Sequence, residues 1–457
     1  MHRGARGGRQ GGAGPKASET GDLSQFWSFR AEPKDMDGTT LIKSIDDVID
    51  ARAVTTVFQP IVRLDSWRRH RPEVVGYEAL TRGPAGTPWE APLELFGAAG
   101  RAGRLAELDW VCRAAAYRAA IDAGLPLGLT LFVNAEPAAL GVPCPPDLAP
   151  AILDAQLRLR VVVEMTERAI ADDPAALLTA AEACRGSGWG VALDDVGAEP
   201  ASLAVMPFVH PDVVKVDRHL TQQPEGAYAA RVVNAIVAYA ERTGAAILAE
   251  GVETREHVAA ALGMGATLGQ GWLFGRPGPL PEDVAERSAT LPVPFVAPPA
   301  GTGTRTPYEI VAGRRPTAEA TKRMLMPLSR YLEEKALDAA EPPILLGCFQ
   351  EARFLTPPTA RRYATVARTA ALVCALGTEI PSAPVPGVRG AAIAGDDPLR
   401  GEWNVVVVGP HFAGALVARD LADDGPDDDR RFTYALTYDR DLVLEAARAL
   451  LHWIVPT

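Results

Sequence analysis

From Thr56 to about residue 274, short apolar runs alternate with longer stretches rich in Ala and Leu. The apolar runs contain many β-branched residues, as buried strands do, and lie at residues 56–64, 74–80, 127–134, 160–167, 190–197, 212–217, 245–253 and 266–274. Between them, helices are expected at 105–124, 174–188 and 227–244, each ending near a Gly. Eight strands, most of them followed by a helix, predict an α/β fold with a (β/α)8 TIM-like barrel.

The pattern breaks between residues 277 and 307, where prolines cluster with a GTGT sequence, as is typical of a linker. Beyond it a second, smaller α/β domain is expected. Its predicted helices lie near 317–339, 359–377 and 442–454, and its predicted strands near 343–349, 389–394, 403–409 and 432–438. Residues 409–414 are expected to form a strand-to-helix turn, because they lack the G-K-[ST] ending of a phosphate-binding loop.

Charge and composition limit the possible partners. The chain has 46 Lys and Arg against 57 Asp and Glu, a net charge of −11, which argues against binding to a nucleic-acid polymer. Its five cysteines are widely spaced, which favours reduced thiols and a cytoplasmic location. No apolar stretch is long enough to span a membrane, so no membrane partner is expected. Residues 1–40 are Gly-rich with scattered Arg and are expected to be a flexible basic tail, or an arm that touches an anionic partner.

Nearly every predicted barrel strand ends in a carboxylate, an amide or an amine. These side chains belong to Glu78, Asn134, Glu164 with Glu167, Asp194 with Asp195, Lys215, Glu250 with Glu253, and Gln270. One such residue alone would be an ordinary helix cap or solvated carboxylate. The carboxyl ends of parallel barrel strands open at one mouth, so the whole set is expected to meet there.

Many carboxylates in one place repel one another unless cations lie among them. Oxygen ligands suit Mg²⁺ or Mn²⁺, and the sequence has no His or Cys cluster with zinc spacing. The adjacent Asp194 and Asp195 could bind two ions, the arrangement used for in-line displacement at phosphorus. Lys215 stands alone among Arg residues and suits a phosphate or a nucleophilic water; the alternative is a lysine that only neutralises its acidic neighbours.

Eight motifs in order resemble those of EAL domains, the phosphodiesterases that linearise cyclic di-GMP. They are FQPI (58–61), YEALTR (77–82), FVN (132–134), EMTE (164–167), LDDVG (193–197), KVD (215–217), AEGVET (249–254) and GQGWLFGRP (269–277). The resemblance implies a barrel, often a homodimer, that uses two Mg²⁺ or Mn²⁺ to hydrolyse cyclic di-GMP to linear pGpG.

The resemblance also implies a role for each motif residue. The implied metal ligands are Glu78, Asn134, Glu164 and Asp194 for the first ion, and Asp194, Asp195 and Glu250 for the second. The implied catalytic residues are Glu250 as proton acceptor, Lys215 beside the attacking water, Glu253, and Glu167 as the anchor of the loop after Asp195. The implied substrate-binding residues are Gln59 for guanine, Arg82 for phosphate, and Gln270.

The loop after Asp194 departs from the family pattern. EAL domains usually have D-F-G-T-G-Y-S-S-L where this chain has DVGAEPASL (195–203), which places Glu199 at the second Gly and Pro200 at the aromatic residue. Glu does not take a positive φ as easily as Gly, so the loop is expected to follow another path. Three hypotheses remain: an active hydrolase, a weak or inactive receptor that still binds cyclic di-GMP, or an interaction scaffold with an empty barrel.

The C-terminal part resembles a DICT domain, a sensory module, in residues 316–334, 345–367 and 402–421. The predicted order is therefore a tail (1–40), an EAL-type barrel (41–285), a Pro-rich linker (286–310) and a DICT-like domain (311–457). This last domain is expected to regulate the barrel in response to an unknown signal, and its helices could equally form a dimer interface.

Overall fold

The computed structural model of the chain describes residues 42–67, 73–136, 139, 141–166, 173–199, 202–282, 284, 289–291, 293, 295 and 305–454. The predicted tail and most of the predicted linker lie outside the described residues.

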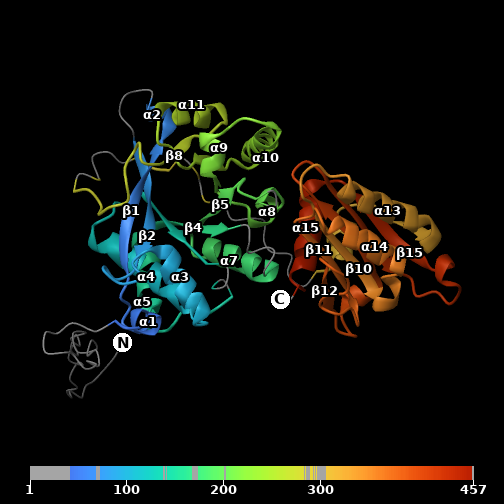
Figure 1. The fold of residues 1–457 in the computed structure, drawn as a ribbon. Helices are drawn as coiled ribbons and strands as arrows, with labels where there is room; N and C mark the ends of the chain where they lie inside the picture. Colours follow the sequence, from blue (N-terminus) through green and yellow to red (C-terminus); the bar gives the residue numbers. More distant parts are fainter. Residues whose placement is uncertain are drawn as a thin grey trace, which may run out of the picture. The chain divides into compact units, whose positions relative to one another are not determined.

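Eight strands close into a barrel in chain order, which confirms the predicted fold class (Figure 1). The strands are β1 (Thr55–Arg63), β2 (Val74–Arg82), β3 (Thr130–Asn134), β4 (Arg160–Thr166), β5 (Gly190–Val196), β6 (Val213–Val216), β7 (Ala246–Ala249) and β8 (Leu268–Gln270). The helices of this domain are α1 (Ile45–Asp50), α2 (Leu64–Trp67), α3 (Pro92–Arg101), α4 (Leu105–Asp122), α5 (Ala149–Arg158), α7 (Pro174–Gly186), α8 (Ser202–Val209), α9 (Arg218–Gln222), α10 (Ala227–Thr243) and α11 (Arg255–Gly263).

The first strand runs against the others. β1 pairs antiparallel with both β2 and β8, whereas the remaining neighbours pair in parallel. A parallel crossover needs a dozen or more residues, and only residues 64–73 separate β1 from β2. The expectation of a wholly parallel barrel is therefore wrong for this strand.

The barrel interior has an apolar layer and a polar layer. The apolar layer is buried and contains Ile61, Phe132, Val162, Ala192, Val213, Leu248 and Leu268. From each of these, the residue two positions further toward the same end of the barrel is polar. These polar residues are Gln59, Asn134, Glu164, Asp194, Lys215, Glu250 and Gln270. Side chains two residues apart share one face of a strand, so the strand period itself places the polar groups on top of the apolar layer.

The covering helices follow from apolar spacing and glycine ends, as in α10. Its buried side chains recur every three or four residues, at Ala229, Val232, Ala235, Ile236 and Tyr239. The helix ends at Gly244, whose φ of 76° is the left-handed conformation of a helix C-cap.

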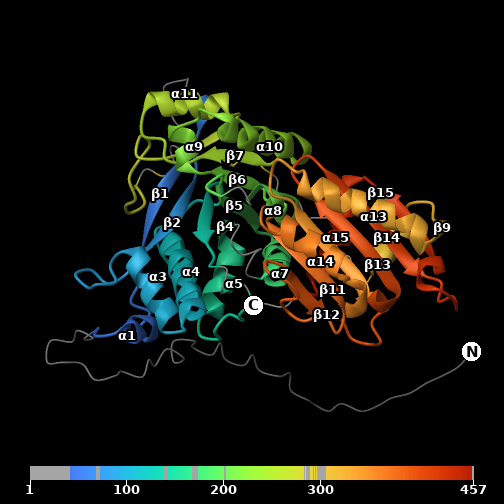
Figure 2. The ribbon, with the colours of Figure 1, turned by 45° about the vertical axis from the view of Figure 1, so that its right-hand side comes forward.

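The second domain is a seven-stranded mixed sheet in the order β12-β11-β10-β13-β14-β15-β9. The strands are β9 (Ala318–Thr321), β10 (Ile344–Glu351), β11 (Leu372–Thr378), β12 (Arg389–Ala392), β13 (Glu402–Val408), β14 (Ala413–Asp420) and β15 (Arg431–Thr437). The helices are α12 (Pro307–Ala312), α13 (Lys322–Leu337), α14 (Pro357–Val366) and α15 (Arg440–Leu451), with short 3-10 turns η4 (Ala352–Phe354), η5 (Pro398–Gly401) and η6 (Asp427–Asp429). α13 and α14 cover one face of this sheet (Figure 2), and the side chains of α12 and α15 pack on the other.

Three expectations for this domain are wrong. The predicted helix at 359–377 ends at Val366 and is followed by β11. The predicted helix at 317–339 begins with β9, and residues 409–414 lead from β13 into β14 rather than into a helix. β11 is buried from Leu372 to Leu376, because helices cover both faces of the sheet. Such a strand shows no alternation of polar and apolar residues, so its pattern cannot be distinguished from that of a buried helix.

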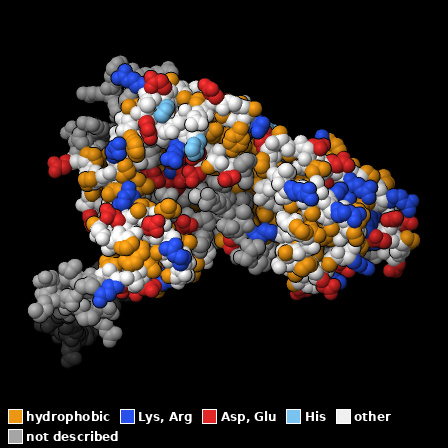
Figure 3. Space-filling model, viewed as in Figure 1, with side chains coloured by type: hydrophobic (Ala, Val, Ile, Leu, Met, Phe, Trp, Pro, Cys, Tyr) orange, Lys and Arg blue, Asp and Glu red, His pale blue; other side chains and the backbone are white. Residues whose placement is uncertain are grey.

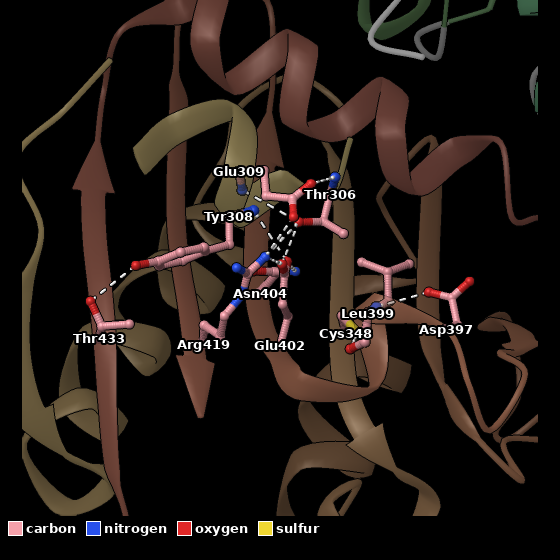
Figure 4. A network of polar contacts seen from close by, with 10 residues as sticks. All are labelled: Thr306, Tyr308, Glu309, Cys348, Asp397, Leu399, Glu402, Asn404, Arg419 and Thr433. Carbon is pink, nitrogen blue, oxygen red and sulfur yellow. Dashed lines mark hydrogen bonds and ion pairs between the residues drawn. The ribbon is translucent and has the colours of Figure 1, made fainter. Parts of the chain in front are cut away.

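A buried carboxylate, Glu402 at the start of β13, fixes α12 on the sheet (Figure 4). Its Oε1 accepts from the Thr306 hydroxyl and, at 3.0 Å, from Arg419 Nη2. Its Oε2 accepts from Tyr308 N at 3.1 Å and from Asn404 Nδ2 at 3.0 Å. Thr306 is also the N-cap of α12 in a capping box, so the carboxylate holds the beginning of the helix.

Replacing Glu402 by Ala should therefore destabilise the second domain by about 3 kcal/mol, because the buried donors lose their acceptor and Arg419 keeps only its more exposed partner Glu309. The measurement is the urea midpoint of the full chain. The matched control is Glu319→Ala, which breaks only an exposed pair with Arg431 and should cost less than about 1 kcal/mol. Equal effects of the two variants would contradict the structural role of Glu402.

Candidate active site

The polar layer of the barrel is centred on the ammonium group of Lys215. Lys215 is 1% exposed, and its Nζ lies 2.8 Å from an oxygen of Asp194, 2.9 Å from Glu164, 2.9 Å from Glu250 and 3.8 Å from Glu78. Burial by itself would lower the pKa of Lys215, but the four carboxylates raise it well above its usual value. The lysine is thus a permanently charged point in the floor of the site.

Asp195 joins this cluster because β5 is irregular. Consecutive strand residues point to opposite faces, so Asp194 and Asp195 could not both face the mouth of a regular strand. The pairing of β5 with β6 shifts register between Leu193 and Val196, and Asp195 takes a φ of 55°. As a result, one ligand atom each of Asp194, Asp195 and Glu250 lie within 4.8 Å of one another. The bulge turns adjacent acids into a group that can hold a metal ion.

The cluster holds more carboxylates than one lysine can neutralise. Burial, together with the neighbouring Glu78 carboxylate, raises the pKa of Glu164 well above its usual value. Burial likewise raises the pKa of Glu250 to about 8, even though Lys215 opposes the shift. The pKa of Glu78, in contrast, is lowered, since Lys215 and two amide groups outweigh its burial. Without a further cation, these acids cannot all be ionised near neutral pH.

The residues present fit such a cation. Glu164 Oε1 is buried and has no hydrogen-bond partner in the described part of the chain, although the other carboxylate oxygen contacts Lys215. Carboxylate and amide oxygens are ligands for hard divalent ions, and an orphaned buried oxygen among them is a natural ligand. Figure 3 shows acidic side chains gathered on the face of the barrel that is turned to the viewer.

A chain of amides supports Glu78 from one side. Asn134 Nδ2 donates to Glu78 Oε1 at 2.9 Å, and Gln270 Nε2 donates to Glu78 Oε2. Gln270 also donates to Gln59 Oε1 at 3.3 Å, and Gln59 donates to the carbonyl oxygen of Gly275 at 3.2 Å. The structure therefore brings Gln59, Asn134 and Gln270 into the cluster, where Gln59 and Gln270 are buried and orient the carboxylate.

Three other predicted residues lie outside this core. Arg82 is half-buried at the end of β2, and its guanidinium, which donates to the carbonyl oxygen of Thr81, forms no ion pair in the described ranges. Glu253 is exposed, and no hydrogen bond or ion pair joins its carboxylate to the described residues of the cluster. Glu167 is outside the described residues. The roles implied for these three residues stay predictions.

Two motif glycines allow the backbone to approach closely at this end of the barrel. Gly251, next to Glu250, has a φ of 62°, and a Cβ there would lie 2.5 Å from the Cβ of Arg218. A Cβ on Gly271, next to Gln270, would lie 2.2 Å from the carbonyl oxygen of Val252. These contacts explain why a Gly follows each of the two functional side chains.

A cavity of about 580 Å³ opens beside Asn134 and Asp195. Part of its wall is a buried pair on α4, in which Arg113 contacts Asp109 at 2.5 Å and stacks on Trp110. Asp109 Oδ1 also accepts from Glu136 N at 2.8 Å and so fixes the chain after β3. This pair was not predicted from the sequence, although an acid and an Arg four residues apart on an otherwise apolar helix face are a usable signal.

The chain belongs to the EAL domain family, whose model matches residues 42–277. Residues 311–421 match a second family, DICT, described as a sensory domain in diguanylate cyclases and two-component systems. The two family matches confirm both resemblances. In the described part of the chain, every helix is too short or too polar to cross a membrane.

Among curated relatives, the cyclic di-GMP phosphodiesterase RocR of Pseudomonas aeruginosa is 34% identical over 126 residues, 26% of this chain and 31% of its own length. An uncharacterized signaling protein of Caulobacter vibrioides is 28% identical over 263 residues, 55% of this chain and 31% of its own. The chain therefore spans less than a third of these relatives. A manganese/cyclic di-GMP complex of Klebsiella pneumoniae BlrP1 aligns with 29% identity and a TM-score of 0.43, over 50% of this chain and 56% of that one.

Divalent cations should stabilise the folded chain through the acidic cluster. At a Mn²⁺ concentration about 100 times the dissociation constant, stability should rise by about 2.7 kcal/mol, measured as an increase in melting temperature. Asp195→Asn removes a ligand charge but keeps a residue that tolerates positive φ, so most of this increase should disappear. The control Glu225→Gln, at an exposed acid, should respond like the unmodified chain; an unchanged response of Asp195→Asn would mean that the ion binds elsewhere.

Proposed function

We propose that the barrel hydrolyses cyclic di-GMP to linear pGpG with the help of two Mg²⁺ or Mn²⁺ ions. The observation that carries this proposal is the convergence of Glu78, Glu164, Asp194, Asp195 and Glu250 around Lys215 at the mouth of an EAL-family barrel. The name of a curated relative, a cyclic di-GMP phosphodiesterase of Pseudomonas aeruginosa, supports the choice of substrate.

The acidic residues and Asn134 would hold the ions, which when bound would neutralise phosphate charge and make water a stronger nucleophile. In the reaction, a water oxygen adds to one phosphorus and the bond from that phosphorus to a ribose oxygen breaks. Glu250, a half-buried carboxylate at the mouth, would accept the proton of the water, and a proton returns to the departing ribose oxygen. Lys215 would place its charge beside the attacking water or a phosphate oxygen.

Substrate contacts would come from the rim of the mouth. Arg82 has a guanidinium without an ion pair among the described residues, and it suits a phosphate oxygen. The cavity of about 580 Å³ beside Asn134 is within the range of small-molecule sites and would accept part of the dinucleotide. Gln59 is buried and already bonded to Gln270, so a guanine would have to compete for its amide.

A second candidate function, a receptor without efficient catalysis, is favoured by the loop after Asp195. Gly197 has a φ of 97°, and a Cβ there would lie 2.2 Å from Leu220, so this glycine fits its position. Glu199 is not among the residues with positive φ, and it forms a β-bridge with Val196. A glycine at this position would allow the loop to adopt conformations with a positive φ, and Glu199 makes those conformations unfavourable.

A product assay separates the two functions. With cyclic di-GMP and Mn²⁺ or Mg²⁺, the chain should release pGpG, and Glu78→Ala should reduce turnover at least about 100-fold through loss of a ligand. Glu225→Gln serves as the control that keeps full activity. No pGpG in spite of micromolar binding of cyclic di-GMP would exclude the hydrolase and leave the receptor; retained turnover in Glu78→Ala would refute the ligand assignment.

The loop itself can be tested by restoring the family residues. The double variant Glu199→Gly and Pro200→Tyr should raise turnover several-fold, because it restores the backbone freedom that Glu and Pro remove. Turnover and cyclic di-GMP affinity are measured together. An unchanged turnover number would show that the altered loop is compatible with catalysis as it stands.

We also propose a homodimer and regulation of the barrel by the DICT domain. These two proposals rest on the family resemblance, and the signal and the sign of regulation are left open.

A further inference from the structure

The second domain contains a cavity of about 470 Å³ between α13, α14 and the face of the sheet that these helices cover. Its volume is within the range of about 300 to 1,000 Å³ that is typical of small-molecule sites. All of its lining residues belong to this domain, from Lys322 to Phe432. The cavity is therefore independent of the acidic cluster in the barrel.

Aromatic rings form the floor and one edge of the cavity. Phe349 on β10 pairs across the sheet with Trp403 on β13, and Trp403 packs edge-to-face on Phe432 with ring centres 5.8 Å apart. Phe354, half-buried in η4, forms the edge, and Lys322 Nζ lies 4.5 Å from its ring centre. Several rings around one space favour a flat, aromatic ligand.

The facing wall is polar and ordered. Arg362 on α14 donates from Nε to Glu333 of α13 at 2.7 Å and from Nη2 to the Thr359 hydroxyl at 3.2 Å. Ser329 donates to the same Glu333 at 3.3 Å, and Thr359 shares a hydrogen bond with Thr356. Hydroxyl groups of this wall can accept or donate further hydrogen bonds, so the wall can orient a ligand.

The backbone at the cavity has an unusual conformation at Gln350, which hydrogen bonds to Asp420, Arg430 and Thr378 hold in place. Gln350 lines the cavity with a φ of 63°, at a register shift where β10 pairs with β11. Among the described residues other than Gly, only Gln350 and Asp195 have a positive φ inside a strand. Asp195 belongs to the candidate active site, and strained residues of this kind concentrate at functional sites.

Most charges around the cavity are paired with one another, and one cation of the lining is available to an anion. Lys322 pairs with Asp427, and Arg323 pairs with Asp429 at 2.9 Å. Arg330 also lines the cavity, is exposed, and has no ion pair within the described ranges. Asp428, the remaining acid of the lining, is exposed on η6. Figure 3 shows Lys and Arg side chains gathered over the part of this domain that carries α13 in Figure 1.

We propose that this cavity is a binding site for a small planar aromatic acid, whose ring lies against Trp403 and Phe354 and whose anionic group pairs with Arg330. Such a ligand would be the kind of molecule that the DICT domain senses. The inference does not depend on hydrolysis by the barrel, because every residue that carries it lies in the second domain.

Calorimetric titration of the full chain with three probes tests the proposal. Indole-3-carboxylate is an aromatic acid, indole-3-carboxamide lacks the charge, and cyclohexanecarboxylate lacks the flat ring. The aromatic acid should bind at least about tenfold more tightly than either analogue, because only it makes both the ring contact and the ion pair. Equal affinity of the carboxamide would overturn the ion pair, and equal affinity of the cyclohexane acid would overturn the ring contact.

Two variants assign the binding to this cavity. Arg330→Ala removes an exposed guanidinium and Phe354→Leu removes a half-buried ring, and each should weaken binding of indole-3-carboxylate about tenfold. The matched control is Lys335→Ala on the same helix, which lies outside the cavity lining and should leave binding unchanged. Melting temperatures of all three variants show whether the fold is kept. No binding of any probe, or binding of indole-3-carboxylate by Arg330→Ala and Phe354→Leu as tight as by the unmodified chain, would overturn the proposal.

Discussion

The barrel depends on one interaction, the buried ammonium of Lys215 among four carboxylates. A charge that is 1% exposed is destabilising unless it is paired, and the same holds for Glu164, which is equally buried. The cost of burying Lys215 and Glu164 is offset because β4, β5 and β6 bring Glu164, Asp194 and Lys215 together, with the carboxylate oxygens within 3 Å of the Lys215 Nζ. The register of neighbouring strands is thus fixed by electrostatics at the mouth as well as by apolar contacts below it.

The sequence alone predicted this arrangement well, for a simple physical reason. Strand side chains alternate, so an apolar residue followed two positions later by a polar one places a polar layer on an apolar floor, as in Phe132 with Asn134 and Val162 with Glu164. What the sequence could not show was the bulge in β5. Its effect on Asp195 depends on the pairing with β6, which is a property of the closed barrel and not of the local residues. The antiparallel direction of β1 was not predicted, because the alternation of side chains is the same whichever way a strand runs.

The second domain was harder to predict, and the errors share one cause. β11 lies in the interior of the sheet with helices over both faces, so its residues from Leu372 to Leu376 are all apolar, and Ala and Leu within it are also good helix formers. Polar signals were hidden in the same way, because Glu402 appears in the sequence as one acid among many. Only the fold shows that Thr306 and Arg419, far apart in the chain, meet at that carboxylate.

Both domains contain a strand residue with a positive φ at a register shift. Asp195 and Gln350 are the described residues other than Gly that take a positive φ within a strand, and each lies at a register shift. The other described residues of this kind follow helices or strands, where such a φ simply ends the element. In β5 the unusual conformation has a visible result, since it turns a second acid toward the metal-binding group. In β10 the same conformation places the Gln350 side chain where it donates to Asp420 at 3.3 Å and accepts from Arg430 at 3.1 Å, in the lining of the aromatic cavity. In both strands a local departure from regular pairing therefore redirects a polar side chain toward a candidate site.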